Sequence, residues 1–270
     1  MARQTGGDRR GRLIGTDEDD VLVGEALNFE PNRVGRNNYI TGGAGNDFLY
    51  GDAGNQDDPF TQGVIPAGAR GGPDRIYGGA GNDSIQGDAQ TIDGGSGGAD
   101  QLFGDDGNDE IFADAVDGRG GARGGNDRVF GGNGDDRLFG DFARDDGTTI
   151  GGNDQLTGGA GRDVFFLGKG RDLVRDFKQG EDFLNIEQVL FGDKRLTFAD
   201  LDKNNDGRLT NADGSHIRIA GTKVTLDLGA AVGGPANVDV TVIQVTRGVV
   251  LGASDFVEFG GRFWDPLPST

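Results

Sequence analysis

The sequence contains no cysteine and only one histidine among its 270 residues. The absence of cysteine excludes a disulfide framework, a thiolate metal site and a cysteine nucleophile. The single His216 leaves little room for a zinc protease site or for a histidine-based catalytic triad. No run of 18 apolar residues occurs, so no membrane-spanning helix is expected. The first ten residues lack an apolar stretch, and no cleavable signal peptide is visible.

Basic residues are scarce beside acidic ones. Lysine and arginine total 26, against 45 aspartates and glutamates, and the net charge is −19. Such a charge repels phosphate backbones and anionic membrane surfaces, so we expect no nucleic-acid or lipid-surface partner but an affinity for cations. Glycine supplies 54 residues, and only 34% of the chain is apolar. This composition is typical either of disorder or of an ion-filled repeat structure, and periodicity distinguishes the two.

A nonapeptide of the form G-G-x-G-x-D-x-U-x, with U a large apolar residue, recurs along the chain. Its copies begin at Gly42, Gly78, Gly104, Gly131 and Gly158, with a weaker copy at Gly15. Successive copies begin 27, 36, 26, 27 and 27 residues apart. Disordered low-complexity sequence does not keep such a step, so the pattern predicts a repeat structure.

A second set of units alternates with the first. Each unit opens with Gly-Asp or Ala-Asp, continues through an insertion of variable length, and closes with Gly-Gly-x-Asp. The opening aspartates are Asp52, Asp88, Asp114 and Asp141, and the closing ones are Asp74, Asp100, Asp127 and Asp154. One coil is therefore a short turn, a strand, a long turn and a second strand. We expect one regular edge and one edge that carries loops, where functional loops are commonly found.

The nonapeptide suits a calcium-binding turn followed by a short strand. Glycines at positions 1, 2 and 4 permit a tight turn and a close approach to an ion. Backbone carbonyls and the position-6 carboxylate are hard oxygen ligands, which Ca²⁺ prefers. The strand's middle residue points inward because strand side chains alternate. The predicted inward row is Leu22, Ile40, Leu49, Ile76, Ile85, Leu102, Ile111, Val129, Leu138, Leu156, Phe165 and Val174.

So thin a core does not offset the chain entropy, and bound ions must supply much of the folding free energy. The repeats resemble those of RTX (repeats-in-toxin), or hemolysin-type calcium-binding, proteins over about Gly15 to Ile186. The resemblance implies an all-β fold, a right-handed parallel β-roll that holds multiple Ca²⁺ between adjacent turns on each edge. We expect about eight to ten ions.

The resemblance also implies the ligands. On the regular edge they are Asp47, Asp83, Asp109, Asp136 and Asp163, below Asp20 of the first coil. On the other edge they are Asp74, Asp100, Asp127, Asp154 and Asp172, and Asp182 follows in the closing segment. The turn glycines are Gly43, Gly45, Gly79, Gly81, Gly132, Gly134, Gly159 and Gly161. The first coil departs from the pattern, with Glu18 for a glycine and Asn38 for an aspartate.

The roll is expected to span residues 15–186, after an N-terminal tail at 1–14. Residues 172–186 resemble the segment that closes RTX rolls in secreted proteases. In 187–270 we expect a small β-rich cap, with a short helix at Leu196–Leu201 and strands at Ile217–Ala220, Lys223–Leu228 and Asp239–Thr246. The acidic-aromatic Asp255–Phe259 resembles the ends of type I secretion substrates, which implies transient contact with a type I exporter.

An EF-hand-like loop lies inside this C-terminal region. Its expected ligands are Asp202, Asn204, Asp206, Arg208 through its carbonyl, Thr210 and Asp213, with Gly207 at the sharp turn. Position 12 is Asp213 rather than the usual glutamate, as in dockerin-like loops. The alternative is a surface turn stabilised by aspartate and glycine; we favour Ca²⁺.

The position-9 residues form two aromatic rows. Tyr50, Phe112, Phe139 and Phe166 are expected to line one outer sheet face, and Tyr77, Phe103 and Phe130 the other. Outward aromatic rows stabilise neighbouring strands, which is the interpretation we favour. The alternative is a surface that binds a partner or a glycan.

The sequence as a whole predicts a secreted, non-enzymatic, calcium-binding structural or interaction protein whose folding is driven by extracellular Ca²⁺. Its partner would be a cell surface, a matrix or a larger assembly, contacted through the looped edge or the aromatic rows. The alternative is an accessory or carbohydrate-acting or -binding module of an RTX exoenzyme system. RTX rolls usually follow a catalytic domain, but this roll begins by Gly15, and we find no catalytic constellation.

Overall fold

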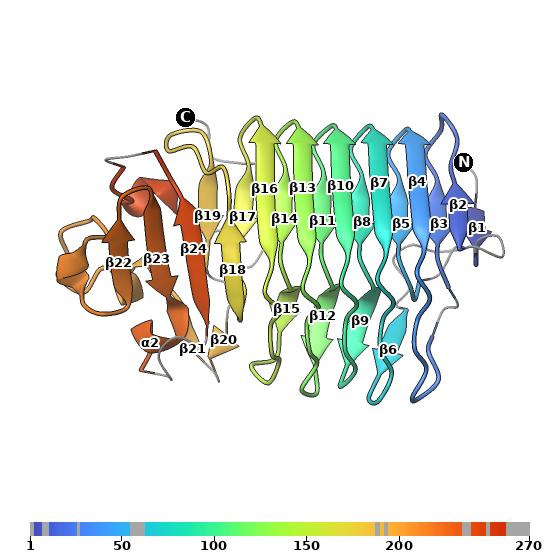
Figure 1. Ribbon diagram of the computed structural model, residues 1–270, viewed down its shortest axis with the longest axis horizontal. Helices are drawn as coiled ribbons and strands as arrows, with labels where there is room; N and C mark the ends of the chain where they lie inside the picture. The colour runs from blue at the N-terminus through green and yellow to red at the C-terminus, as the bar shows by residue number, and fades with distance from the viewer. Residues whose placement is uncertain are drawn as a thin grey trace.

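The computed structural model describes residues 3–6, 11–25, 28–54, 63–186, 190–191, 194–233, 239–246 and 249–257. Through most of this length the chain is a parallel β-roll whose coils stack along the long axis of the molecule (Figure 1). The expected all-β parallel roll is thus confirmed. No helix of the described residues is long and apolar enough to cross a membrane.

Two main sheets form the roll, and consecutive coils pair in parallel. The eight-stranded sheet is β1 (Arg3–Thr5), β3 (Val21–Val23), β5 (Phe48–Tyr50), β8 (Ser84–Gln86), β11 (Glu110–Phe112), β14 (Arg137–Phe139), β17 (Val164–Phe166) and β19 (Phe183–Asn185). The roll part of the ten-stranded sheet is β2 (Arg12–Ile14), β4 (Tyr39–Ala44), β7 (Arg75–Ala80), β10 (Gln101–Asp106), β13 (Arg128–Asn133), β16 (Gln155–Ala160) and β18 (Arg171–Val174). The segment 1–14, expected as a tail, thus contributes a strand to each sheet.

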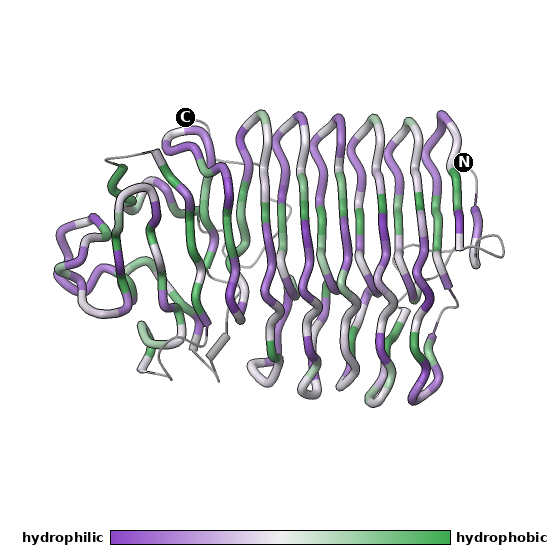
Figure 2. Tube along the Cα trace, viewed as in Figure 1, coloured by the Kyte–Doolittle hydropathy of each residue, from purple (hydrophilic) through white to green (hydrophobic). Residues whose placement is uncertain are grey.

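The space between the two sheets is filled by the predicted inward row. All twelve of its side chains are 0% exposed, and they belong to one continuous hydrophobic core. Figure 2 shows the hydrophobic stretches recurring at the same level of successive coils. One apolar side chain per strand suffices because each side chain stacks on the equivalent residue of the next coil, as Leu102 does between Ile76 and Val129.

Where the structure describes them, the insertions contain strands, which differs from the expected loops. They form a third parallel sheet of β6 (Val64–Pro66), β9 (Ala89–Asp93), β12 (Ala115–Arg119) and β15 (Phe142–Asp145), visible beside the ends of the main strands (Figure 1). Their returning legs also pair in parallel, for example Arg70 with Ser96. A separate small core that includes Ile65, Ile92 and Phe142 holds them together. The insertions recur in phase, so their backbones and apolar residues stack like those of the nonapeptides.

The C-terminal region continues the ten-stranded sheet. β24 (Val240–Gln244) pairs in parallel with β18, and β23 (Lys223–Asp227) and β22 (Ile217–Ala220) follow antiparallel. These three strands and α1 (Phe198–Leu201) lie where the sequence predicts strands and a short helix. The remaining elements are β20 (Leu190–Phe191), β21 (Lys194–Arg195), α2 (Leu228–Ala231) and two 3₁₀ turns at Asn211–Asp213 and Ala253–Asp255. Glu258 and Phe259 of the expected secretion signal lie outside the described residues.

One of the two aromatic rows does not lie on an outer surface, so that expectation is wrong. Tyr50, Phe112, Phe139 and Phe166 are at most 2% exposed. The chain that enters each insertion turns back over them: Gly54 packs on the Tyr50 ring, and Ala143 joins the cluster of the phenylalanines. The second row is half-buried on the outer face of the ten-stranded sheet, with Phe103 stacked between Tyr77 and Phe130 at 4.6 and 4.9 Å.

Candidate metal centres

The position-6 aspartates of the regular edge form a vertical row, here called the regular row: Asp47, Asp83, Asp109, Asp136 and Asp163. Each uses Oδ1 to accept the backbone N–H of the equivalent residue one coil earlier. The distances from N to Oδ1 are 2.7 Å for Asp20 to Asp47, 2.7 Å for Asp47 to Asp83, and 2.8 Å for Asp83 to Asp109. Oδ1 therefore fixes the stacking of the coils, and only Oδ2 is available to an ion.

The Oδ2 atoms of the regular row are buried and accept no hydrogen bond. An ionised carboxylate buried in this way is costly unless a cation or a donor compensates it. Burial accordingly raises the pKa of Asp83 to about 7 and that of Asp136 to about 8, with further increases from neighbouring carboxylates. Each Oδ2 is thus a buried acceptor that no protein donor satisfies.

Backbone carbonyls meet these oxygens at the turns. A Cβ on Gly42 would overlap Asp47 Oδ2 and lie 2.5 Å from the carbonyl oxygen of Gly78. In the next coil, a Cβ on Gly78 would overlap Asp83 Oδ2 and lie 2.6 Å from the carbonyl oxygen of Gly104. Two hard oxygen acceptors therefore converge at each turn, as Ca²⁺ coordination requires. The donor set fits the ion that the sequence predicts.

The predicted turn glycines all adopt positive φ. The values range from 104° at Gly45 to 132° at Gly134. A side chain at these positions would also collide with the backbone of the coil before, for example Gly79 with the carbonyl of Gly43. Glycine is needed here for both reasons, and these residues position the carbonyls rather than supply a side-chain ligand.

The insertion edge carries an equivalent line, the closing row: Asp74, Asp100, Asp127, Asp154 and Asp172. Again Oδ1 accepts the N–H of the preceding coil, at 2.7 Å for Asp74 to Asp100 and for Asp100 to Asp127, and Oδ2 has no hydrogen-bond partner. Burial raises the pKa of every member well above the usual value, with nearby carboxylates adding to the rise. The two edges therefore use the same arrangement.

The insertion edge also has carboxylates that sequence reasoning did not place in a site. These are the opening aspartates, here called the opening row: Asp52, Asp88, Asp114 and Asp141. All are at most 4% exposed. Among the residues the structure describes, Asp141, Asp154 and Asp172 alone form a group of three whose ligand atoms lie within 4.8 Å of one another. The recurring Gly-Asp or Ala-Asp opening is the signal that marks this row in the sequence.

Both ends of the rows differ from the middle. In the first coil the N–H and hydroxyl of Thr16 donate to Asp20 Oδ2, at 2.6 and 2.9 Å, so this oxygen is satisfied by protein groups. Asn38 Nδ2 donates to the Gly51 carbonyl at 2.8 Å. At the other end, Asp182 accepts N–H groups on both oxygens, from Asp163 at 3.2 Å and from Lys178 at 2.7 Å. These terminal positions have less need of an ion.

The EF-hand-like loop closes on itself through backbone donors. Asp202 Oδ2 accepts the N–H of Gly207 at 2.8 Å, and Asp213 accepts those of Asn204 and Thr210 at 3.3 and 2.7 Å. Asp202 and Asp213 are buried, whereas Asn204, Asp206 and Arg208 are exposed. Within the described chain its three carboxylates do not approach one another as closely as Asp141, Asp154 and Asp172 do. Calcium binding by this loop stays a prediction.

The family model of the RTX calcium-binding nonapeptide repeat (4 copies) matches residues 5–26, 35–55, 69–97, 91–119, 122–146 and 151–174, more than half of the chain. A search of curated proteins finds no match. The matched segments contain the stacked turns whose buried oxygens lack partners. The chain therefore belongs to the family of RTX calcium-binding repeat proteins, and Ca²⁺ is its cofactor.

Proposed function

We propose that this calcium-binding repeat protein is secreted, and that extracellular Ca²⁺ drives the folding of its roll for a structural or interaction role. The observation that carries the proposal is the set of stacked carboxylates on both edges, each buried with one unpartnered oxygen. Without a cation these like charges repel along both edges of a roll whose apolar core is thin. At submicromolar cytosolic Ca²⁺ the chain is open, which suits export, and at extracellular concentrations mass action favours the folded roll.

The chemistry of the site also supports a role without catalysis. The buried aspartates that might suggest acid-base chemistry use one oxygen for coil stacking and present the other to an ion. The only histidine, His216, is buried with Nε2 2.9 Å from the Leu201 carbonyl. Membership in a family whose characterised members are typically exported supports secretion through a type I exporter.

An interaction surface is a second candidate role, favoured by the half-buried aromatic row on the outer sheet face. Tyr39, 40% exposed, extends the stack of Tyr77, Phe103 and Phe130 on the outer sheet face, with ring centroids of Tyr39 and Tyr77 5.6 Å apart. Arg75 lies over Tyr77 and Phe103 at 5.4 and 5.5 Å. Flat aromatic surfaces of this kind bind sugars or protein partners.

A calcium titration followed by far-UV circular dichroism tests the folding proposal, with Mg²⁺ as the control ion. We expect a cooperative gain of β signal with Ca²⁺, none with Mg²⁺, and reversal by EGTA, because Mg²⁺ demands a smaller octahedral site. A chain that is already fully folded in EGTA would overturn the ion-driven folding.

A further inference from the structure

The opening row is stacked as regularly as the other two rows. The backbone N–H of Asp52 donates to the carbonyl of Asp88, and that of Asp88 to Asp114, both at 3.0 Å. The pairing of Ala115 with Phe142 places Asp141 next in line. The row is therefore a continuous line of buried carboxylates along the insertion edge, in addition to the closing row. This edge has two aspartates per coil where the regular edge has one.

Neighbouring members of the opening row face each other across a glycine without a side chain. A Cβ on Gly97 would overlap Asp114 Oδ1 and lie 2.6 Å from Asp88 Oδ2. A Cβ on Gly124 would likewise collide with Asp141 Oδ1 and lie 2.6 Å from Asp114 Oδ2. None of these glycines has a positive φ, so their requirement is the space and not the backbone conformation. Because each glycine has no side chain, it leaves a space into which two carboxylates point.

These carboxylates lack the donors that buried anions need. One N–H reaches each side chain, from Gly72 to Asp52, Gly98 to Asp88, Gly125 to Asp114 and Gly152 to Asp141. Oδ1 of Asp52 and Oδ2 of both Asp114 and Asp141 accept no hydrogen bond. Two ionised carboxylates have only acceptors to offer each other, so a cation between them is the group that satisfies both.

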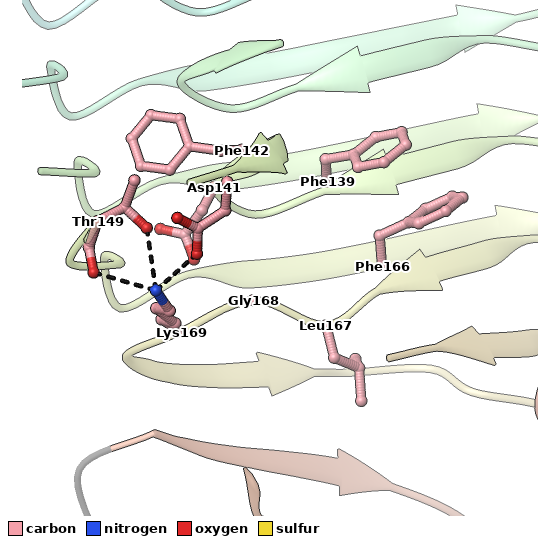
Figure 3. Close-up of a pocket in the computed structure, with 9 residues that line it drawn as sticks. Phe139, Asp141, Phe142, Thr149, Phe166, Leu167, Gly168 and Lys169 are labelled. Carbon is pink, nitrogen blue, oxygen red and sulfur yellow. Dashed lines mark hydrogen bonds and ion pairs between the residues drawn. The ribbon is translucent and has the colours of Figure 1, made fainter. Parts of the chain in front are cut away.

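A protein cation closes the row at its C-terminal end. In the coil after Asp141 the equivalent position is a glycine, and the next residue is Lys169 (Figure 3). Its side chain is only 10% exposed; Nζ lies 2.6 Å from Asp145 Oδ2 and 3.3 Å from the carbonyl and hydroxyl of Thr149. The equivalent space at Gly151 accordingly has Asp141 on one side and the Lys169 backbone on the other.

The N-terminal end of the row is closed in the same manner. Glu25 precedes Asp52 in the register, since its N–H donates to the Asp52 carbonyl at 2.9 Å. Its carboxylate is paired with the Arg33 guanidinium and accepts the N–H of Arg36 at 2.5 Å. Side-chain cations thus lie near both ends of the row: Arg33 pairs with Glu25 and attracts Asp52, and Lys169 pairs with Asp145 and attracts Asp141. Asp88 and Asp114, in the middle of the row, have no ion pair among the described residues.

We propose that the opening row supplies calcium ligands of its own, forming with the closing row a line of doubly acidic Ca²⁺ sites along the insertion edge, and that Lys169 takes the place of the last cation. The inference rests on calcium binding by the repeats, as proposed above. The insertion edge then binds Ca²⁺ more tightly than the regular edge, because affinity rises with the number of charged ligands. The insertions serve to deliver this second carboxylate to each coil.

Three full-length variants of one coil test the ligand assignment. Asp114→Asn removes an opening-row charge, and Asp109→Asn removes a regular-row charge. Asp117→Asn, within β12 and ion-paired with Arg144, is the matched control. Bound Ca²⁺ per chain is measured by equilibrium dialysis and atomic emission. We expect both Asp109→Asn and Asp114→Asn to lose at least one ion, and Asp117→Asn to keep the wild-type number.

The outcomes distinguish a failure of the opening-row assignment from a failure of the regular-row assignment. A loss in Asp109→Asn with a wild-type count in Asp114→Asn overturns the opening-row sites and leaves the repeat function standing. Unchanged counts in both overturn the assignment of ligands to either row, because neither carboxylate would then be needed to hold an ion. Should Asp114→Asn fail to fold, anomalous diffraction from wild-type crystals grown in CaCl₂ decides: we expect peaks about 2.3–2.6 Å from opening-row oxygens, and peaks confined to the regular and closing rows refute the assignment.

Lys169→Gln tests the terminal cation. The neutral side chain removes the ammonium that pairs with Asp145 and attracts Asp141, so we expect this variant to bind one more Ca²⁺ than the wild type. An unchanged count, with the variant folded by circular dichroism, would show that Lys169 does not stand in for an ion.

Discussion

Protons should replace calcium in part, because they neutralise the same carboxylates. In the calcium-free fold, burial raises the pKa of Asp47, Asp83 and Asp163 from 3.8 to about 7 each, and neighbouring carboxylates add to the rise. A shift of this size corresponds to about 4 kcal/mol for ionising each group within the fold. Because Asp83 is itself one of the carboxylates that raise the pKa of Asp47, these costs overlap, but even one is a large part of the roughly 5–15 kcal/mol stability of a typical domain.

The direction of the pH effect follows from these pKa values. Because they are higher in the folded than in the unfolded chain, the calcium-free fold binds protons more tightly than the unfolded chain does. The resulting stabilisation is complete below about 3.8 and is lost as the pH rises through about 7. We therefore expect the calcium-free chain to be unfolded at about pH 8 and to gain β structure as the solution is acidified.

The assay is far-UV circular dichroism of protein freed of calcium on a chelating resin, since EGTA binds calcium poorly in acid. A calcium-saturated sample gives the reference signal, and light scattering excludes aggregation near the isoelectric point. The reasoning would be refuted by a calcium-free chain that keeps the full β signal at about pH 8, or by one that gains none in acid.

Three further predictions concern single positions. Leu138→Ala, at a fully buried member of the inward row, should lower the free energy of unfolding of the calcium-loaded protein by about 2–5 kcal/mol in urea, while Ile150→Ala, 48% exposed, should change it little. Gly134→Ala should raise the calcium midpoint of folding, since the new Cβ strains a φ of 132° and strikes the preceding coil; Gly180→Ala, with φ 82° and open space, bears only the strain, and equal midpoints would contradict this account. Asp213→Asn should remove one Ca²⁺ and leave the β signal of the roll intact, and a wild-type ion count would exclude the EF-hand-like site.

The inward row and the strands were predictable because they depend on period alone. A residue such as Leu102 is buried by its equivalents one coil away, so the repeat itself specifies its surroundings. The burial of Phe139 was not predictable in this way. Alternation only indicates that it points away from the roll interior, and its cover comes from Ala143 and the start of the insertion, which no nonapeptide pattern describes.

The insertions were misjudged for a related reason. Their variable length suggested loops, yet the backbone of each pairs with the next because their starts keep the step of the coil, as Ala89 pairs with Ala115. The same phase stacks Asp88 on Asp114, so an opening aspartate read as part of a turn is in fact one of a buried row. The repeat register predicts which residues lie at each level of the roll. It does not predict which of two candidate carboxylates faces a ligand, because that depends on the spaces that glycines leave in the folded chain.

The two carboxylate oxygens of each position-6 aspartate have different roles in the stacking of the coils. Oδ1 accepts an N–H of the adjacent coil at 2.7 to 3.2 Å. These bonds join protein groups alone, so the register of the coils is encoded by the chain itself. Oδ2 has no protein donor in the interior coils, so the energy of the stack depends on what neutralises it. Under the proposed function, calcium decides whether the roll forms and the chain decides which roll forms. At the ends of the rows the protein supplies some of this compensation itself: Thr16 donates to Asp20, Arg33 pairs with Glu25, and Lys169 pairs with Asp145 beside Asp141.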